Sequence, residues 1–170
     1  MLTLTQLVSL TAAYGTKTDP NYGHKIVERA GSCVTYIVRS IYDLDRDKKP
    51  YRKVLAKSRD MNTKSDPTKI MTFRFYGMHR AIMDDQCWVS CSCEFFTYNL
   101  EVALTTQGSS SVINSNGNMP IKRNPNTKPA LCKHLLAAVK RIQKIKFDIP
   151  KSTFTNPNSP DEFEYHPELK

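Results

Sequence analysis

The sequence lacks an apolar run long enough to cross a membrane. No stretch approaches the roughly 18 consecutive apolar residues that a membrane-spanning helix requires. Residues 1–14 also lack a basic segment ahead of their apolar residues, so no signal peptide is predicted. We therefore expect a protein made in the cytoplasm without a signal peptide and with no membrane partner.

Recognisable catalytic patterns are also missing. The Gly-x-x-x-x-Gly-Lys motif of phosphate-binding loops is absent. Asp84 and Asp85 are adjacent carboxylates without an evident partner for acid–base work. Cys132 and His134 offer a thiol and a base, but residues two apart rarely align as a nucleophile pair, and no third orienting residue stands out. The sequence does not predict an enzyme.

Charge is distributed unevenly along the chain. The net charge is +9, and residues 148–170 hold five carboxylates against two lysines, so this segment carries −3 and residues 1–147 carry +12. A basic body favours anionic partners, either nucleic acid or the acidic surface of another protein. Ordinary solvated surface charge is the alternative explanation.

The five cysteines occur in a chain without an export signal, which favours metal binding over disulfides. Cys91 and Cys93 form one candidate ligand pair, and Cys132 and His134 form a second. Three thiols and one imidazole are the ligands of a tetrahedral zinc site. Four protein ligands leave no position for water or substrate, so we expect one structural zinc ion.

The two pairs place demands on the backbone. Residues two apart on a regular strand lie about 6.5 Å apart, too far for two sulfurs on one zinc ion, so the chain should bend or leave the strand ladder at Ser92. Residues two apart on a helix point roughly 200° apart, so Cys132 should precede the first turn, with His134 just inside it. A thiolate at Cys132 then lies near the positive end of the helix dipole.

Two other cysteines remain to be placed. Cys87 is the nearest rival ligand, and it would give an all-cysteine set with His134 released. Such a set would also suit an iron–sulfur cluster, although His134 favours the mixed zinc site. Cys33 is interpreted as a core thiol.

At these residues the chain resembles the SWIM zinc-finger family, whose pattern is Cys-x-Cys, a spacer, then Cys-x-His. The segment 88–96 (WVSCSCEFF) is similar to that family's strand and turn, and 132–137 (CKHLLA) to its helix. The resemblance covers residues 87–145, although 38 residues separate Cys93 from Cys132, a long spacer for this family. It implies a zinc module that can bind nucleic acid.

A weaker resemblance connects the long spacer to some uncharacterised tailed-phage proteins. It is carried by Glu101-Val102-Ala103 after the first ligand pair and by Asn124-Pro125 before the second. It implies a structural protein that is incorporated into a virion.

Hydrophobic patterning predicts an α+β fold, a small antiparallel sheet with a zinc-pinned C-terminal helix. A helix is expected at 5–14, strands at 32–42, 51–59, 71–76 and 87–91, a strand or short helix at 98–104, and a basic amphipathic helix at 131–145. Three parts are predicted: a helical segment at 1–30, a basic domain at 31–147 that contains the zinc module, and an extended proline-rich tail at 148–170.

The spacer loop, residues 107–130, holds five Asn, four Ser, two Gly and three Pro among its 24 residues. Irregular spans of this length in a compact domain are usually functional. With the aromatic-containing tail, this loop favours a structural subunit of a larger assembly, such as a tailed-phage virion, that contacts other protein subunits in a homo- or hetero-oligomer.

A nucleic-acid-binding module is the alternative function. Its candidate contacts are Lys133, Lys140, Arg141 and Lys144 on the 131–145 helix, together with the basic hairpin at 32–59. Common RNA readers present exposed aromatic side chains among basic ones, whereas the aromatics here are expected mainly at core-facing strand positions.

Overall fold

A computed structural model describes residues 1–63, 67–77 and 81–145. The C-terminal tail, residues 148–170, lies outside these ranges. The elements run in the order α1 (Leu4–Ala12), α2 (Tyr22–Gly31), β1 (Cys33–Leu44), β2 (Pro50–Asp60), β3 (Lys69–Tyr76), η1 (Ile82–Asp84), β4 (Gln86–Cys91), α3 (Glu94–Asn99), α4 (Glu101–Thr106) and α5 (Lys133–Ile142).

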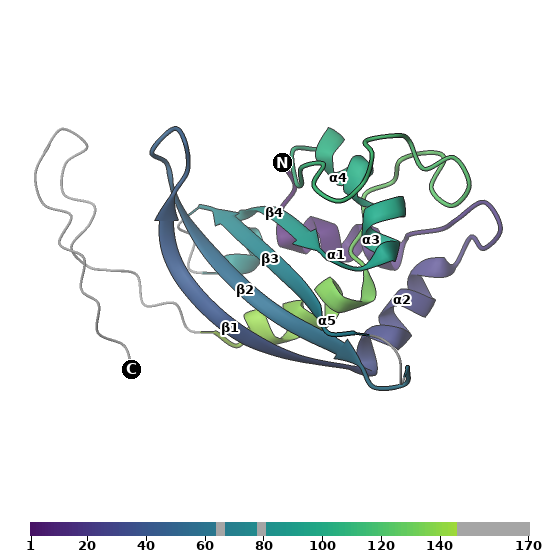
Figure 1. Cartoon of the computed structure of the whole chain (residues 1–170), viewed down its shortest axis with the longest axis horizontal. Coiled ribbons are helices and arrows are strands. Elements are labelled where there is room, and N and C mark those ends of the chain that lie inside the picture. Colours follow the sequence, from purple (N-terminus) through teal and green to yellow (C-terminus); the bar gives the residue numbers. More distant parts are fainter. Residues whose placement is uncertain (64–66, 78–80, 146–170) are drawn as a thin grey trace, which may run out of the picture.

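The four strands form an antiparallel meander in the order β1-β2-β3-β4 (Figure 1). Side chains alternate between the two faces, and β3 shows this most clearly because Met71, Phe73 and Phe75 are fully buried while the residues between them are half-buried. A bulge interrupts the β1–β2 register between Ile37 and Arg39. The α+β fold and the four expected strands are confirmed.

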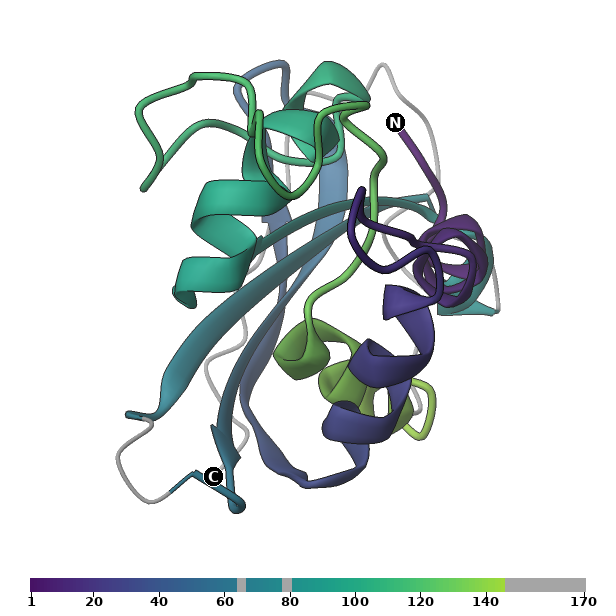
Figure 2. The same cartoon turned by 90° about the vertical axis from the view of Figure 1, so that its right-hand side faces the viewer.

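Helices α1, α2 and α5 lie on one face of the sheet (Figures 1 and 2). Helix α5 packs against β1, β2 and α2, and its buried side chains include Leu135, Val139 and Ile142. They join one core cluster with the inward side chains of β2, β3 and β4. The amphipathic pattern at 131–145 therefore predicted both this helix and the face that it buries.

Helix α1 occupies the place of the helix expected at 5–14. Thr3 and Gln6 form a capping box, in which each side chain accepts a hydrogen bond from the other residue's backbone N–H. The Thr11 hydroxyl accepts a hydrogen bond of 2.8 Å from the backbone N–H of Leu131. A helix this short needs tertiary contacts, and this bond holds it beside the chain that enters α5.

Two helical regions differ from the sequence predictions. Residues 19–23 (DPNYG) are typical of a turn, and this pattern obscured α2 in the sequence. The helix begins at Tyr22 and approaches α1 so closely that a Cβ on Gly23 would meet the Thr11 carbonyl oxygen at 2.3 Å. Residues 98–104, expected as a strand or short helix, belong to the end of α3 and to α4. No helix in the described ranges is long and apolar enough to span a membrane.

The aromatic side chains of the sheet face both ways. Phe73 and Phe75 face the core as expected, but Tyr51 and Trp88 lie on the opposite face. On that face the Arg74 guanidinium lies 4.5 Å from the Trp88 ring centroid and 5.6 Å from the Tyr51 ring centroid. The expectation that aromatics fall mainly at core-facing positions is therefore wrong for these residues. The sequence did not reveal which face these two residues occupy. The face depends on the register of each strand, and strand pairing in the folded sheet sets that register.

Candidate metal centre

The first ligand pair lies where β4 gives way to α3. Strand β4 ends at Cys91, so the chain leaves the strand at Ser92, as the spacing of the two cysteines predicted, and it bends at Cys93. The Ser92 hydroxyl accepts a hydrogen bond from the Ile70 N–H at 2.9 Å, and the Ser92 N–H donates to the Ile70 carbonyl at 3.0 Å. The Ser92 hydroxyl oxygen thus takes part in the last contact with β3. This contact lets the backbone turn after the strand, and the turn brings the Cys93 thiol back toward Cys91.

Cys93 also serves as the N-cap of α3. Its sulfur accepts a hydrogen bond of 3.4 Å from the backbone N–H of Phe96. The cap satisfies one of the free N–H groups at the helix start and fixes the sulfur's position.

The second pair lies at the start of α5. Cys132 is the N-cap, with extended backbone angles of φ −76° and ψ 167°, and His134 is the second residue of the helix. This is the arrangement that the two-residue spacing predicted. Because Cys132 precedes the helix and His134 lies within it, both side chains can turn toward the same point.

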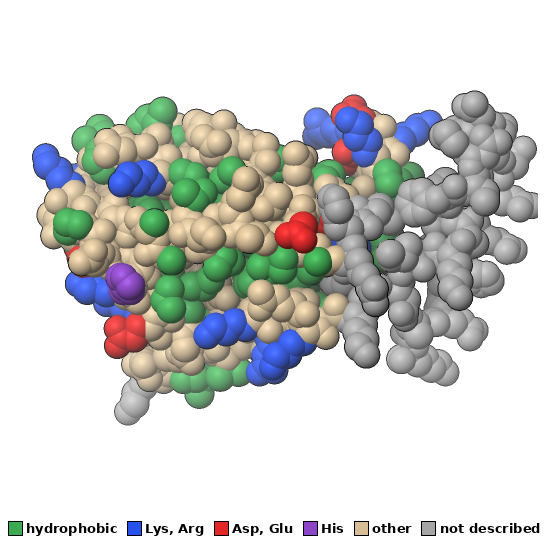
Figure 3. Space-filling model, turned by 180° about the vertical axis from the view of Figure 1, so that it is seen from behind, with side chains coloured by type: hydrophobic (Ala, Val, Ile, Leu, Met, Phe, Trp, Pro, Cys, Tyr) green, Lys and Arg blue, Asp and Glu red, His purple; other side chains and the backbone are tan. Residues whose placement is uncertain are grey.

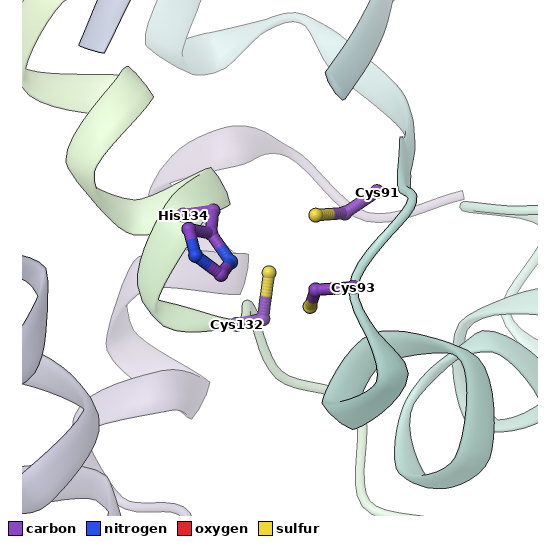
Figure 4. A group of neighbouring side chains, drawn as sticks. All are labelled: Cys91, Cys93, Cys132 and His134. Atoms are coloured by element: carbon purple, nitrogen blue, oxygen red, sulfur yellow. The ribbon is translucent and has the colours of Figure 1, made fainter. Parts of the chain in front are cut away.

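The four candidate ligand atoms lie within 4.8 Å of one another. Figure 4 shows the Cys91 and Cys93 side chains directed from the strand end toward Cys132 and His134 at the helix start. All four residues are buried. Residues far apart in the sequence thus form one buried Cys₃His group that can hold a metal ion.

The protonation of the three thiols is coupled. Burial raises the pKa of the Cys91 and Cys132 thiols well above their usual range. Hydrogen bonds from the Cys132 and Cys91 thiols instead hold the pKa of Cys93 well below its usual range. A bound cation would favour the thiolate form of all three ligands and displace their protons.

The two remaining cysteines are not part of this group. Cys87 is buried and lies four residues before Cys91 on the same strand, a separation of roughly 13 Å at about 3.3 Å per residue. Burial raises the pKa of its thiol. Cys33 is half-buried at the start of β1. The structure thus does not bring Cys87 to the ligand group.

Sequence reasoning missed the carboxylate that supports the second ligand pair. Asp60, the last residue of β2, pairs with the Lys133 ammonium and accepts a hydrogen bond of 2.8 Å from the Ser32 hydroxyl. Lys133 stands between Cys132 and His134, so this pair connects the ligand segment to the sheet. Asp60 ends a predicted strand, but no local pattern marks it as a partner of residue 133.

Two buried polar residues hold the spacer loop, one within its first half and one near its C-terminal end. The Glu101 carboxylate accepts hydrogen bonds from the backbone N–H groups of Asn114 and Ser115, the latter at 2.8 Å. The Asn124 side chain donates to the carbonyls of Asn99 and Lys128 and accepts from the Lys128 N–H, at 2.8–2.9 Å. Both belong to the segments on which the phage resemblance was based. Their role was missed because each acts through long-range contacts.

The other candidate contacts on α5 lie apart from this group. Lys140, Arg141 and Lys144 are exposed at the C-terminal end of the helix and beyond it, whereas Lys133 is partly buried by its pairing with Asp60. Figure 3 shows the molecule from behind, with basic side chains scattered over the surface among apolar ones. The structure thus does not gather the four basic residues predicted on this helix into one patch.

Comparison of the chain with protein-family models, with curated proteins and with solved structures finds no match.

Proposed function

We propose that Cys91, Cys93, Cys132 and His134 bind one zinc ion that acts as a structural crosslink. Thiolates at about 2.3 Å and an imidazole at about 2.0 Å from zinc place tetrahedral ligand atoms roughly 3.5–3.8 Å apart. Ligand atoms that already lie within 4.8 Å of one another fit such a site after small side-chain adjustments. The donor set favours zinc over an iron–sulfur cluster, which usually takes four thiolates.

A zinc ion at this position would connect three elements. It would join the end of β4, the start of α3 and the start of α5, which are adjacent only in the folded chain. The ligands come from the protein alone and are buried, so a bound ion would have no open coordination position. We therefore propose a stabilising rather than a catalytic metal, and a non-enzymatic protein.

The partner surface that we propose is the spacer loop, as part of a larger assembly. Four large apolar side chains of this loop are exposed, with exposed fractions of 46% for Val112, 56% for Ile113, 57% for Met119 and 81% for Ile121. Glu101 holds this segment at Ser115, and Asn124 anchors the chain just after it. Apolar side chains on an ordered loop suit contact with another protein subunit. The weaker resemblance carried by the long spacer, at residues 101–103 and 124–125, suggests a tailed-phage particle as the kind of assembly.

Native mass spectrometry of the purified chain, with and without a strong chelator, tests both parts of this proposal. The expected result is one zinc ion per chain, together with a defined oligomer or a complex with a neighbouring subunit.

Val112→Ser with Ile113→Ser should weaken that association. The matched control, Val34→Ser with Val38→Ser, removes exposed apolar side chains from β1 and should leave association unchanged. A metal-free folded protein would contradict the zinc proposal, and a chain that stays monomeric at about 100 µM would contradict self-assembly.

A further inference from the structure

A hollow on the described part of the chain lies beside the Cys₃His group. It has a volume of about 940 Å³ and is referred to here as the basic groove. Helix α2, the start of α3, residues 119–123 of the spacer loop and the start of α5 line it, and Figure 2 looks toward these elements. Its size is near the upper end of the range for ligand sites, and it opens to solvent along one side.

The groove is strongly basic. Its lining includes five cationic side chains and one carboxylate, that of Glu94; the cations belong to Arg29, Lys69, Lys122, Arg123 and Lys133. Lys133 is engaged by Asp60. Arg29, Lys122 and Arg123 are exposed and make no ion pair with any residue in the described ranges.

Three cations around one concave surface create a positive potential that attracts an anionic chain. Zinc held by three thiolates would carry a net charge of −1. That charge would reduce the positive potential of the groove without reversing it.

Aromatic side chains form one wall of the same groove. Tyr22 and Phe95 stack with their ring centroids 5.6 Å apart and an interplanar angle of 22°. Tyr98 lies one helical turn after Phe95 on α3, so the two side chains share a face, and its exposed fraction is 67%. An exposed ring beside a rigid aromatic pair is a surface on which a planar base can stack.

We propose that the basic groove binds single-stranded nucleic acid, with phosphates at Arg29, Lys122 and Arg123 and a base stacked on Tyr98. Phosphate contacts supply sequence-independent affinity, and stacking accepts any base. A single strand fits better than a duplex because only unpaired bases can leave the strand and reach an aromatic side chain. This site adds to the proposed assembly role and does not depend on it.

Fluorescence anisotropy with a labelled twelve-residue oligothymidylate and the full-length, zinc-loaded chain tests this site. We expect a Kd of roughly 1–100 µM at 100 mM salt, the range of sequence-independent binding. Three phosphate contacts predict a slope of about −2 in the plot of log affinity against log salt, at about −0.7 per contact. Lys122→Gln with Arg123→Gln should weaken binding roughly tenfold or more and reduce the slope by about 1.4.

Tyr98→Ala separates stacking from charge. It should weaken binding roughly 5- to 100-fold, which corresponds to ~1–3 kcal/mol for one stacked base, while the salt slope stays unchanged. The controls remove the same groups elsewhere: Lys140→Gln with Lys144→Gln for the charges, and Tyr36→Ala, on exposed β1, for the ring. Circular dichroism checks that each variant remains folded.

The outcomes decide the proposal clearly. Binding that is lost in the groove variants and retained in the controls supports it. Absence of binding at 50 mM salt would overturn it. Two further outcomes would overturn it, because binding would then reflect the general charge of the chain. In the first, the control variants lose as much affinity as the groove variants. In the second, duplex and single strand bind equally well and Tyr98→Ala has no effect.

Discussion

Lys133 and Asp60 pair across the boundary between α5 and the end of β2, beside the Cys₃His group. Burial by itself would raise the pKa of the Asp60 carboxyl. Hydrogen bonds from Lys133, Ser32 and the backbone N–H of Asn62 outweigh that effect and hold the pKa well below its usual range. The ionised carboxylate therefore fixes the residue between two candidate ligands to the end of β2.

Replacing Asp60 should weaken both the fold and the metal site. Asp60→Asn removes the carboxylate charge that pairs with the partly buried Lys133 ammonium. We expect the free energy of unfolding to fall by roughly 1–3 kcal/mol, less than for a fully buried pair because Lys133 is partly exposed. Loss of a group that orients ligands should weaken metal affinity about 10- to 100-fold. Urea denaturation and a competition titration against a chromophoric chelator measure the two effects.

Asp19→Asn is the matched control, because it breaks the more exposed pair between Asp19 and Lys25. Its effect on unfolding should be smaller than that of Asp60→Asn, and metal affinity should not change. An Asp60→Asn variant that binds metal as tightly as the wild type would contradict the orienting role.

The Asp60 pair also makes a prediction about acid. A carboxyl with a lowered folded pKa contributes stability above its unfolded pKa of 3.8 and loses it as the pH falls through the folded value. The difference in unfolding free energy between wild type and Asp60→Asn should therefore be full at pH 6 and shrink below about pH 4. A difference that stays constant across this range would mean that the charge of Asp60 is irrelevant. Parallel urea titrations from pH 6 to pH 3 measure it.

Removing one ligand should remove the metal and most of the folded state. Cys132→Ser deletes the thiolate at the start of α5, and structural zinc contributes its binding energy directly to folding. We expect less than one-tenth of the wild-type metal content, with loss of the near-ultraviolet dichroism of the buried aromatics. Elemental analysis and circular dichroism measure both.

Cys33→Ser is the control for thiol replacement as such, since Cys33 is half-buried outside the ligand group. It should keep one metal ion per chain and unfold at nearly the wild-type urea concentration. A Cys132→Ser variant that remained folded and metal-loaded would contradict the proposed ligand set.

The sequence could predict the elements whose signal is local. Alternation of apolar residues marked the strands, a 3.6-residue period marked α5, and the Cys-x-Cys and Cys-x-His spacings fixed how the backbone must run at Ser92 and Cys132. These features follow from backbone geometry over a few residues. The structure agrees with them for that reason.

Features created by tertiary contact could not be predicted in the same way. Helix α2 starts inside a turn-like segment, and only its approach to α1 explains Gly23. Asp60, Glu101 and Asn124 contact residues 73, 14 and 25 positions away, and neighbouring sequence carries no signal for these contacts. The basic groove likewise combines residues from five regions of the chain.

The spacer loop should lose order when its second anchor is removed. Asn124→Ala leaves the carbonyls of Asn99 and Lys128 and the Lys128 N–H without their side-chain partner, and we expect a loss of about 1–3 kcal/mol. Hydrogen exchange should accelerate in the part of the loop near residue 124 more than in the sheet. Asn126→Ala, at an exposed position two residues away, should have little effect. Equal exchange in both variants would mean that Asn124 does not hold the loop.

Tyr14 makes a prediction in alkali. Its side chain is 1% exposed and its hydroxyl has no hydrogen-bond partner within the described ranges. Burial and the neighbouring Tyr22 raise the pKa of Tyr14 to about 12. Between pH 10 and 12 the unfolded chain therefore releases a proton that the folded chain keeps, so the free energy of unfolding should fall by up to about 3 kcal/mol over this range. Tyr14→Phe should lack this component and should be about 1 kcal/mol more stable at pH 7, because it removes an unsatisfied buried group. Urea titrations of both proteins at pH 7, 10 and 12 test this, and an identical alkaline loss in the two would show that Tyr14 is not its source.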